Sequence, residues 1–200
     1  MVKFRSMTSD EYKMDQSTFR LLYAFYPTPF GKCLIAITDM DKAVVYFGFV
    51  DGVEERALKI LQNEWPLSQL SEDTGRETKS IIEKVFQSDE ASLDSLCVLL
   101  RGTLFQVQVW KSLMTIPKGE CITYEEVAKT IDNPKAIRPV GNAISKNRVA
   151  YIVPCHRVTN KKADSDKYAW GVERKQAILR YERGLVVGDV VGDCEDHAVV

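Results

Sequence analysis

The sequence predicts an α+β protein with two domains, and three observations support this prediction. Segments rich in β-branched and aromatic residues follow one another between residues 19 and 50. Two stretches with helical periodicity come next, which gives a strand-then-helix α/β domain over residues 1–100. From Leu104 onward the hydrophobic spacing is helical, which predicts a helical domain over residues 101–184. Residues 185–200 lack usable periodicity and carry several acids, so we expect a flexible tail.

The N-terminal domain contains three predicted strands, with the sequences FRLLYAFY, GKCLIAITD and AVVYFGFV. Turn sequences, PTPFG and DMDK, separate them, which is typical of a β-meander. The next stretch, GVEERALKILQNEW, places four apolar residues on one helical face: Val53, Ala57, Ile60 and Leu61. A second helix is expected at ETKSIIEKVFQS, and SLDSLCVLLRGT is expected to connect the two domains.

The C-terminal domain begins with a predicted helix, LFQVQVWKSLMTI, which PKGE ends. The sequence TYEEVAKTI opens with a capping box, in which Thr123 caps the helix start and Glu126 reaches back. A turn at DNP leads to a short helix in KAIRPVGNAISKN. Because proline is tolerated only in the first turn of a helix, Pro139 predicts a helix start near residue 136 or 137. Arg138 then lies at the N-terminal end of this helix.

Two helices with a tight turn and basic ends form the pattern of a helix-turn-helix, whose second helix presents its N-terminal end to DNA. Many small helical domains share this pattern. The charge distribution also bears on whether this domain binds DNA. Residues 111–183 carry 15 Lys and Arg against 8 Asp and Glu, a net charge of +7. Since the whole chain has a net charge of −1, the remainder carries −8. A polyanion-binding C-terminal half and a merely solvated basic surface both fit these charges.

The composition excludes several classes of protein. With 45% hydrophobic and 28% charged residues, the chain is globular rather than disordered. It has no apolar run near the roughly 20 residues that cross a bilayer, and its N-terminus lacks the apolar core of a secretory signal. Five widely spaced cysteines indicate reduced thiols in a cytoplasmic or nuclear setting. With only two histidines, a structural zinc site is not expected, and no cofactor is expected.

The stretch YIVPCHRVTN places a thiol, Cys155, next to an imidazole, His156. A free cysteine is most often a small buried hydrophobe, and YIVPC is typical of a buried strand entering a turn. A reactive cysteine is the alternative, because the imidazole can take the thiol proton and the thiolate is a nucleophile. Pro154 would end the strand and hold the thiol at the turn. The residues alone favour the reactive cysteine.

These residues carry a resemblance to a known family. The motif PCHRV resembles the active-site motif of the O6-alkylguanine-DNA alkyltransferases, the methylated-DNA–protein-cysteine methyltransferases. The run from GTLFQVQVWK to ISKN, and then YIVPCHRV and YAWGVERKQAILRYE, follow the family's C-terminal domain in order. YAWGVERK looks most like the bacterial adaptive-response type, and YPTPFGKCLIAITD matches the N-terminal domain more loosely. The resemblance implies a ribonuclease-H-like N-terminal domain and a winged-helix C-terminal domain.

The resemblance implies that Cys155 takes the alkyl group from O6-alkylguanine, and less readily from O4-alkylthymine. The thioether has no easy route back to a thiol, so one molecule repairs one lesion. His156 matches the proton acceptor, which acts through a water, and Glu182 matches the carboxylate that orients it. By itself Glu182 would be an ordinary surface residue on a helix. Asn147 matches the residue that braces the turn before the active site, and its plain interpretation is a helix C-cap.

Further residues acquire roles from the same resemblance. Tyr124 matches a tyrosine that contacts the flipped base and stabilises charge on the leaving purine, although a half-buried aromatic is its plain interpretation. Arg138 matches the arginine that fills the vacated space in the base stack. Three more residues are expected to contact DNA, and four to line the substrate pocket: Ala136, Asn142 and Ser145, and then Pro154, Tyr168, Ala169 and Trp170. The bulk of Trp170 predicts that methyl groups transfer better than benzyl groups.

The sequence also departs from the family. The loop TNKKADSDKY lacks the glycines common there, and Pro139 replaces a small residue. The zinc ligands of some N-terminal domains are absent, and so is a separate methyl-sensing domain, so we expect repair without self-regulated transcription. The expected partner is double-stranded DNA containing O6-alkylguanine, bound through the minor groove, by a monomer that does not associate with membranes. A non-catalytic DNA-binding module and a thiol hydrolase using Cys155, His156 and Glu182 are the two alternative functions.

Overall fold

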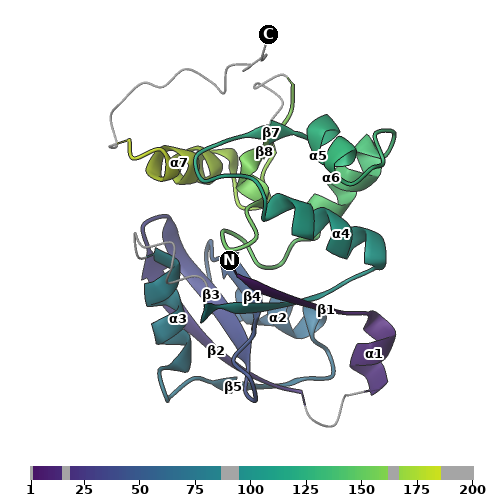
Figure 1. Cartoon of the computed structure of the whole chain (residues 1–200). Helices are drawn as coiled ribbons and strands as arrows, with labels where there is room; N and C mark the ends of the chain where they lie inside the picture. Colours follow the sequence, from purple (N-terminus) through teal and green to yellow (C-terminus); the bar gives the residue numbers. More distant parts are fainter. Residues whose placement is uncertain (1, 15–18, 87–94, 162–166, 186–200) are drawn as a thin grey trace. The chain divides into compact units, whose positions relative to one another are not determined.

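The computed structural model describes residues 2–14, 19–86, 95–161 and 167–185, which have a mixed α+β fold (Figure 1). The chain divides into two compact units. The first contains Met1–Val107 and Asn147–Ile152, and the second contains Gln108–Lys146 and Val153–Val200. Of the predicted tail, only Leu185 belongs to the described residues. No helix among the described residues is long and apolar enough to span a membrane.

A six-stranded sheet forms the centre of the first unit, with the strand order β1-β6-β4-β3-β2-β5 (Figure 1). The predicted meander is confirmed, since β2 pairs antiparallel with β3 and β3 with β4. The outer strands are added in parallel: β1 pairs with β6, and β5 with β2. The strands are β1 (Lys3–Met7), β2 (Arg20–Thr28), β3 (Gly31–Thr38), β4 (Val44–Phe49), β5 (Gln69–Glu72) and β6 (Cys97–Arg101).

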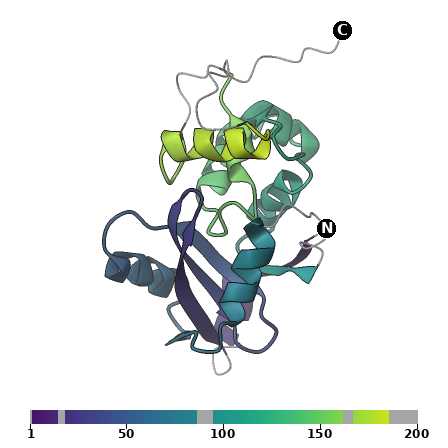
Figure 2. The ribbon, with the colours of Figure 1, turned by 90° about the vertical axis from the view of Figure 1, so that its left-hand side faces the viewer.

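Helices cover both faces of this sheet, which explains why β4 is buried along its whole length. The two predicted helices are confirmed as α2 (Glu54–Glu64) and α3 (Glu77–Phe86), and they lie on opposite sides of the strands (Figure 2). Ala57 and Leu61 of α2 join one core cluster with Leu34 of β3. On α3, the Phe86 ring packs against Phe47 of β4, with ring centroids 6.3 Å apart.

The prediction of a connector at residues 92–103 is wrong, because Cys97–Arg101 form the buried strand β6. Three other elements of the first unit were not predicted: β1, β5 and the helix α1 (Ser9–Met14). All are short, and the parallel partner of β1 lies about 90 residues away in sequence, so no local pattern reveals the pairing. Within α1, Tyr12 is buried and its hydroxyl lies 2.8 Å from Ser68 Oγ.

The short segment Asn147–Ile152 belongs to the first unit, although both neighbouring segments of the chain belong to the second. It pairs with β4 through an isolated parallel bridge between Phe47 and Val149, where the Phe47 amide donates to the Arg148 carbonyl at 2.8 Å. The Arg148 side chain pairs with Glu64 at 2.6 Å. The Tyr151 ring packs on Phe86 at 4.9 Å, and its backbone has a φ of 64°.

The second unit is mainly helical. The helices α5 and α6 follow one another across a turn, and the Trp110 indole of α4 donates to the Ala143 carbonyl of α6 at 2.9 Å. The division between the two units falls within α4. The elements are α4 (Leu104–Leu113), β7 (Ile122–Thr123), α5 (Tyr124–Thr130), α6 (Ile137–Ser145), β8 (Val158–Thr159) and α7 (Val172–Glu182), with a 3₁₀ turn at Cys155–Arg157.

Local signals fix the starts of α5 and α6 as predicted. The capping box is present: the Glu126 amide donates to Thr123 Oγ1 at 3.2 Å, and the Thr123 amide donates to Glu126 Oε2 at 2.6 Å. Helix α6 begins at Ile137 after the N-cap Ala136, so Pro139 lies in the first turn, where it removes no helical hydrogen bond.

The expectation of a strand at YIVPC is wrong. Residues 150–153 form turns, and Cys155 starts the 3₁₀ turn. The Cys155 amide donates to the Val153 carbonyl at 2.8 Å, and the Arg157 amide donates to the Pro154 carbonyl at 3.0 Å. The positive φ of Tyr151 and the missing amide hydrogen of Pro154 both oppose a continuous strand. The thiol therefore lies at the start of a tight turn.

Candidate functional site

A cavity of about 980 Å³ opens in the second unit, beside α5 and α6. Seven of the predicted site residues line it: Tyr124, Arg138, Ser145, Cys155, Tyr168, Ala169 and Trp170. They come from three parts of the second unit: the helices α5 and α6, the 3₁₀ turn, and the chain before α7. The volume lies at the upper end of the range of small-molecule sites.

Cys155 is 6% exposed, and its exposed part lies on the wall of this cavity. It is therefore packed like a core residue on one side and open to a ligand on the other. Cys33 of the first unit makes a useful contrast: it is fully buried in β3, and burial raises the pKa of its thiol to about 12. Both are free thiols, but only Cys155 lines the cavity.

His156, next to the thiol, is completely buried and points away from solvent toward α7. Its Nε2 lies 2.9 Å from Glu182 Oε1, and the Glu182 side chain is only 1% exposed. Burial lowers the pKa of His156, and Glu182 acts in the opposite direction without reversing the shift. The imidazole is therefore neutral near pH 7.

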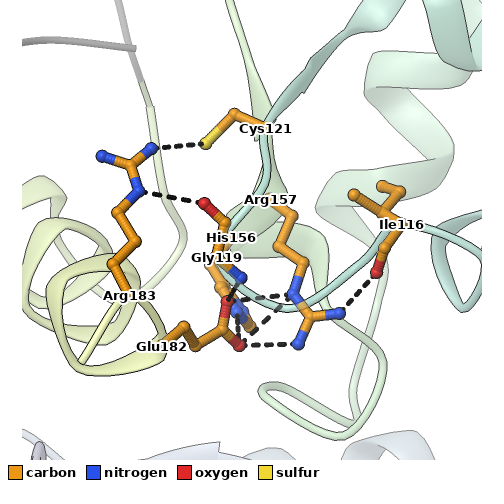
Figure 3. A network of polar contacts seen from close by, with 7 residues as sticks. All are labelled: Ile116, Gly119, Cys121, His156, Arg157, Glu182 and Arg183. Atoms are coloured by element: carbon orange, nitrogen blue, oxygen red, sulfur yellow. Dashed lines mark hydrogen bonds and ion pairs between the residues drawn. The ribbon is translucent and has the colours of Figure 1, made fainter.

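Glu182 accepts hydrogen bonds from three sides (Figure 3). Arg157 Nη2 donates to its Oε1 at 2.7 Å, and the Gly119 amide donates to its Oε2 at 3.0 Å. Burial by itself would raise the pKa of Glu182, but the hydrogen bonds from His156 and Arg157 outweigh burial and bring the pKa to about 2. Arg157 is held in turn by the Ile116 carbonyl, 2.6 Å from its Nη1.

These protonation states define the tautomer of His156. Because Glu182 is an ionised acceptor, Nε2 must carry the proton, and in a neutral ring Nδ1 is then the basic nitrogen. A neutral imidazole next to a cysteine, oriented by a carboxylate, is the arrangement that generates a thiolate nucleophile. The site can therefore perform nucleophilic chemistry at the Cys155 sulfur.

Tyr168 also lines the cavity, with Trp170 beside it at a ring-centroid distance of 5.3 Å. Its hydroxyl oxygen is buried and lies beside the Cys155 thiol. Burial raises the pKa of Tyr168 well above its ordinary value, and negative charge on Cys155 raises it further. The phenol therefore stays protonated beside the Cys155 sulfur.

Helix α6 and the neighbouring loops give the mouth of the cavity a basic character. Arg138 is exposed in the first turn of α6 and lines the cavity. Lys161 and Lys167 also line it, and Lys161 Nζ lies 2.5 Å from Glu125 Oε2. A phosphate-bearing ligand would find cations at this rim.

Six predicted site residues do not line the cavity: His156, Glu182, Asn147, Ala136, Asn142 and Pro154. His156 and Glu182 lie behind the thiol, and Pro154 is buried just before it. Ala136 is 7% exposed at the N-cap of α6, while Asn142 is exposed on that helix. Asn147 is buried, and its Oδ1 accepts from the Val149 amide at 3.0 Å; the C-cap of α6 is Lys146.

Several residues of the site received no predicted role. Arg157, in the motif itself, donates hydrogen bonds to the Glu182 carboxylate and to the Ile116 carbonyl. Arg183 donates to the Gly119 carbonyl at 2.9 Å, which fixes the loop whose amide binds Glu182. The motif could have drawn attention to Arg157, but nothing local indicates that residues near 119 meet α7. Among the described residues, no cluster of His, Cys, Asp and Glu could hold a metal ion.

Comparison with known proteins gives a consistent result. Residues 104–184 match the family model of the 6-O-methylguanine DNA methyltransferase, DNA binding domain. The methylated-DNA–protein-cysteine methyltransferase of Methanosarcina acetivorans is 35% identical over 162 residues, which cover 81% of this chain and 98% of that protein. The Ada protein of Escherichia coli, a bifunctional transcriptional activator and DNA repair enzyme, is 32% identical over 88% of this chain and 49% of its own length.

The chain thus spans about half the length of the first curated relatives it matches. Among solved structures, the O6-methylguanine methyltransferase of Mycobacterium tuberculosis aligns with a TM-score of 0.64 at 27% identity, covering 84% of this chain and 96% of that one. Its complex with DNA aligns with a TM-score of 0.60 at 26% identity, covering 82% and 93%. By its sequence, its fold and its PCHRV turn, this chain belongs to the methylated-DNA–protein-cysteine methyltransferase family.

Proposed function

We propose that this protein repairs O6-alkylguanine in DNA by moving the alkyl group irreversibly to its own Cys155, once per molecule. One observation carries the proposal: the Cys155 thiol lines the cavity, and the next residue of its turn, His156, is paired with the buried Glu182 of α7. O4-alkylthymine is a poorer substrate of the same site. The family membership and the relatives named for this activity support the proposal.

Activation of the thiol begins with proton transfer. His156 Nδ1 accepts the Cys155 proton through a water, and Nε2–H remains hydrogen-bonded to Glu182. The carboxylate stabilises the imidazolium that forms, as in other nucleophile–base–acid arrangements. Arg157 and Gly119 keep Glu182 ionised and fixed, so the imidazole does not rotate away.

The transfer itself exchanges one bond for another. The Cys155 thiolate attacks the alkyl carbon, an S–C bond forms, and the bond between that carbon and O6 breaks. The electron pair stays on the guanine, which takes up the proton that left the thiol. Tyr124, at the start of α5 on the cavity wall, stabilises the charge that develops on the purine. The product is a thioether, so the protein does not turn over.

The base must leave the duplex to reach the cavity, which costs a few kcal/mol. Arg138 offsets part of this cost by filling the space in the base stack, and its exposed position at the mouth of the cavity supports that role. Ala136, at the N-cap of α6, and Asn142 and Ser145 on that helix contact the DNA, which docks by its minor groove. Tyr168, Ala169 and Trp170 enclose the base, and the buried Pro154 supports the turn behind it.

Finer features belong to the same proposal. The first unit has a ribonuclease-H-like fold, and α5 and α6 form the helix-turn-helix of a winged-helix domain; the three-stranded meander and the two helices support these assignments. Asn147 braces the passage from α6 to the active turn. The protein acts as a monomer on double-stranded DNA and is cytoplasmic, or nuclear in a eukaryote, which agrees with free thiols among the described cysteines.

Intact-mass measurement tests the proposal directly. The protein is incubated with a duplex containing one O6-methylguanine, and a gain of one methyl group that stops at one equivalent is expected. The variant Cys155→Ser and an undamaged duplex are the matched controls, and neither gives a gain. Binding without any mass gain in the native protein would instead identify a non-catalytic DNA-binding module, and repeated turnover of unmodified protein would identify a hydrolase.

A further inference from the structure

We propose that Lys175 is a positioning residue of the transfer reaction: its buried ammonium group holds the far end of the turn that carries Cys155 and His156 and places a fixed positive charge beside the imidazole. This inference rests on the proposed function and deepens it. The mechanism described above gives no role to Lys175, although this charged residue is buried next to the reacting groups.

The burial of Lys175 requires an explanation. Its residue is only 2% exposed, and its Nζ donates to the Val158 carbonyl at 2.8 Å. Lysine is almost never fully buried, because an ammonium group that leaves water loses a large hydration energy. An apolar residue of similar length would fill the same space at a lower cost. A cation at this position therefore indicates a role for the charge or for its hydrogen bond.

The spacing along α7 shows what Lys175 holds. Lys175 and Glu182 are seven residues apart, about two helical turns, so they lie on the same face of the helix. The buried Ile178 and Leu179 fill the space between them. Glu182 binds His156 within the 3₁₀ turn, and Lys175 binds Val158 immediately after it. Helix α7 thus binds the reactive turn at two points, through the carboxylate of Glu182 at one and the ammonium group of Lys175 at the other.

Lys175 also connects the turn to the chain segment before α7 that lines the cavity. Its amide donates to the Gly171 carbonyl at 3.2 Å, and the Gly171 amide donates to the Tyr168 carbonyl at 3.1 Å. Tyr168 lines the cavity that Cys155 also lines. One residue therefore joins the nucleophile's turn to the Tyr168 segment of the cavity wall, and loss of its side-chain hydrogen bond would loosen their mutual geometry.

The charge of Lys175 acts on His156 together with a small set of neighbours. The charged groups around the imidazole are Glu182 and Lys175 from α7 and Arg157 from its own turn. The titratable Cys155 and Tyr168 lie on the cavity side. After burial, which is the largest cause, the two cations lower the pKa of His156, while Glu182 raises it. Removal of Lys175 must raise the pKa of His156, so the imidazole becomes protonated at a higher pH.

Two substitutions separate the hydrogen bond from the charge. Lys175→Met removes both, and Lys175→Gln removes the charge but keeps a donor. The exposed Lys79 of α3, paired only with Glu83 on the same helix at 3.8 Å among the ion pairs described, gives the matched control Lys79→Met. Each variant is assayed for single-turnover methyl transfer across a pH series, for binding to lesion DNA, and for thermal unfolding.

A second readout does not depend on transfer. The chain has only two histidines, so in a His197→Gln background the single imidazole signal of His156 can be titrated by NMR. This titration is performed on the full chain with Lys175 and with each of the two variants. If the native protein transfers no alkyl group at all, the proposed function fails, and the titration still decides whether Lys175 controls the imidazole.

We expect Lys175→Met to slow transfer at neutral pH by at least about tenfold, as displacement of a reacting group does, with binding of DNA unchanged within about twofold. The acidic limb of its pH–rate profile should move to higher pH, and the midpoint of the His156 NMR titration should move in the same direction. Lys175→Gln should recover part of the rate but show the same titration shift, and Lys79→Met should match the native protein. If Lys175→Met does not fold, Lys175→Gln alone must show the shift.

Two results would overturn the inference. One is a folded Lys175→Met variant that transfers methyl at the native rate with an unchanged pH profile. The other is a variant with a lower unfolding temperature in which the His156 titration does not move and glutamine recovers no activity. The second result would leave Lys175 with a purely structural role.

Discussion

The substitution Glu182→Gln tests the electrostatic structure of the site most closely. Glutamine keeps the shape of the side chain and can still accept a hydrogen bond, but it carries no charge. In the native protein this carboxylate, 1% exposed, is surrounded by His156, the Arg157 guanidinium and the Gly119 amide. The substitution therefore leaves the buried side of Arg157 without its counter-ion.

The loss of stability expected for Glu182→Gln follows from the pKa of Glu182. Folding lowers the pKa of Glu182 from 4.5 to about 2, and at about 1.4 kcal/mol per unit this corresponds to about 3 kcal/mol. Because the folded pKa is the lower one, this stability is fully present above about pH 4.5 and is lost as the pH falls toward 2. By pH 3 about 2 kcal/mol of it is gone, since the unfolded chain is by then largely protonated.

Urea unfolding at pH 7 and pH 3 measures this dependence. We expect Glu182→Gln to unfold with about 3 kcal/mol less free energy than the native protein at pH 7, and about 1 kcal/mol less at pH 3. The control is Glu83→Gln, an exposed residue of α3 whose pair with Lys79 contributes at most about 0.5 kcal/mol. An equal loss at both pH values for Glu182→Gln would refute the reasoning, because the effect would then not come from an ionised carboxylate.

Three further predictions address other parts of the account. Arg138→Ala should slow transfer from duplex DNA by about tenfold, equivalent to about 1.4 kcal/mol of the extrusion cost, and slow transfer from single-stranded DNA much less; equal effects would contradict its role. Native protein offered O6-methyl- and O6-benzylguanine together should prefer methyl, and Trp170→Ala should narrow that preference. Thr123→Ala removes the cap of α5 and should cost about 1 kcal/mol in urea unfolding, whereas an unchanged midpoint would exclude the capping box as a source of stability.

Local patterns were sufficient where the chemistry of an element is contained in its own residues. The meander, the helices α2 and α3 and the capping box at Thr123 all follow from alternation, periodicity or a residue pair three positions apart. Pro139 located the start of α6 because proline restricts a helix in only one way.

Local sequence patterns did not predict the elements that depend on contacts between distant parts of the chain. The strand β6 has five residues, and its parallel pairing with β1 depends on contacts across most of the first unit. The turn at Cys155 depends on the positive φ of Tyr151, whose ring packs on Phe86 far away in sequence. A short apolar run followed by proline does not distinguish such a turn from a strand.

The candidate functional site also contains some residues that the local sequence reveals and others that only the packing reveals. Cys155 and His156 attract attention by being adjacent, but Glu182 resembles any exposed helical glutamate until α7 is placed against the turn. Its role came from the resemblance to a family and not from its surroundings in the sequence. Arg157 and Lys175 were not recognised, because only the packing of α7 reveals which charges are buried.

The central claim is that the sulfur of Cys155 receives the carbon. The most direct test uses a duplex whose O6-methylguanine carries an isotopically labelled methyl group, followed by proteolysis and tandem mass spectrometry of every cysteine peptide. Five cysteines compete for the label: 33, 97, 121, 155 and 194. The account predicts one label per protein molecule, entirely on Cys155. Label on another cysteine, or a fully repaired duplex with unlabelled Cys155, would contradict it.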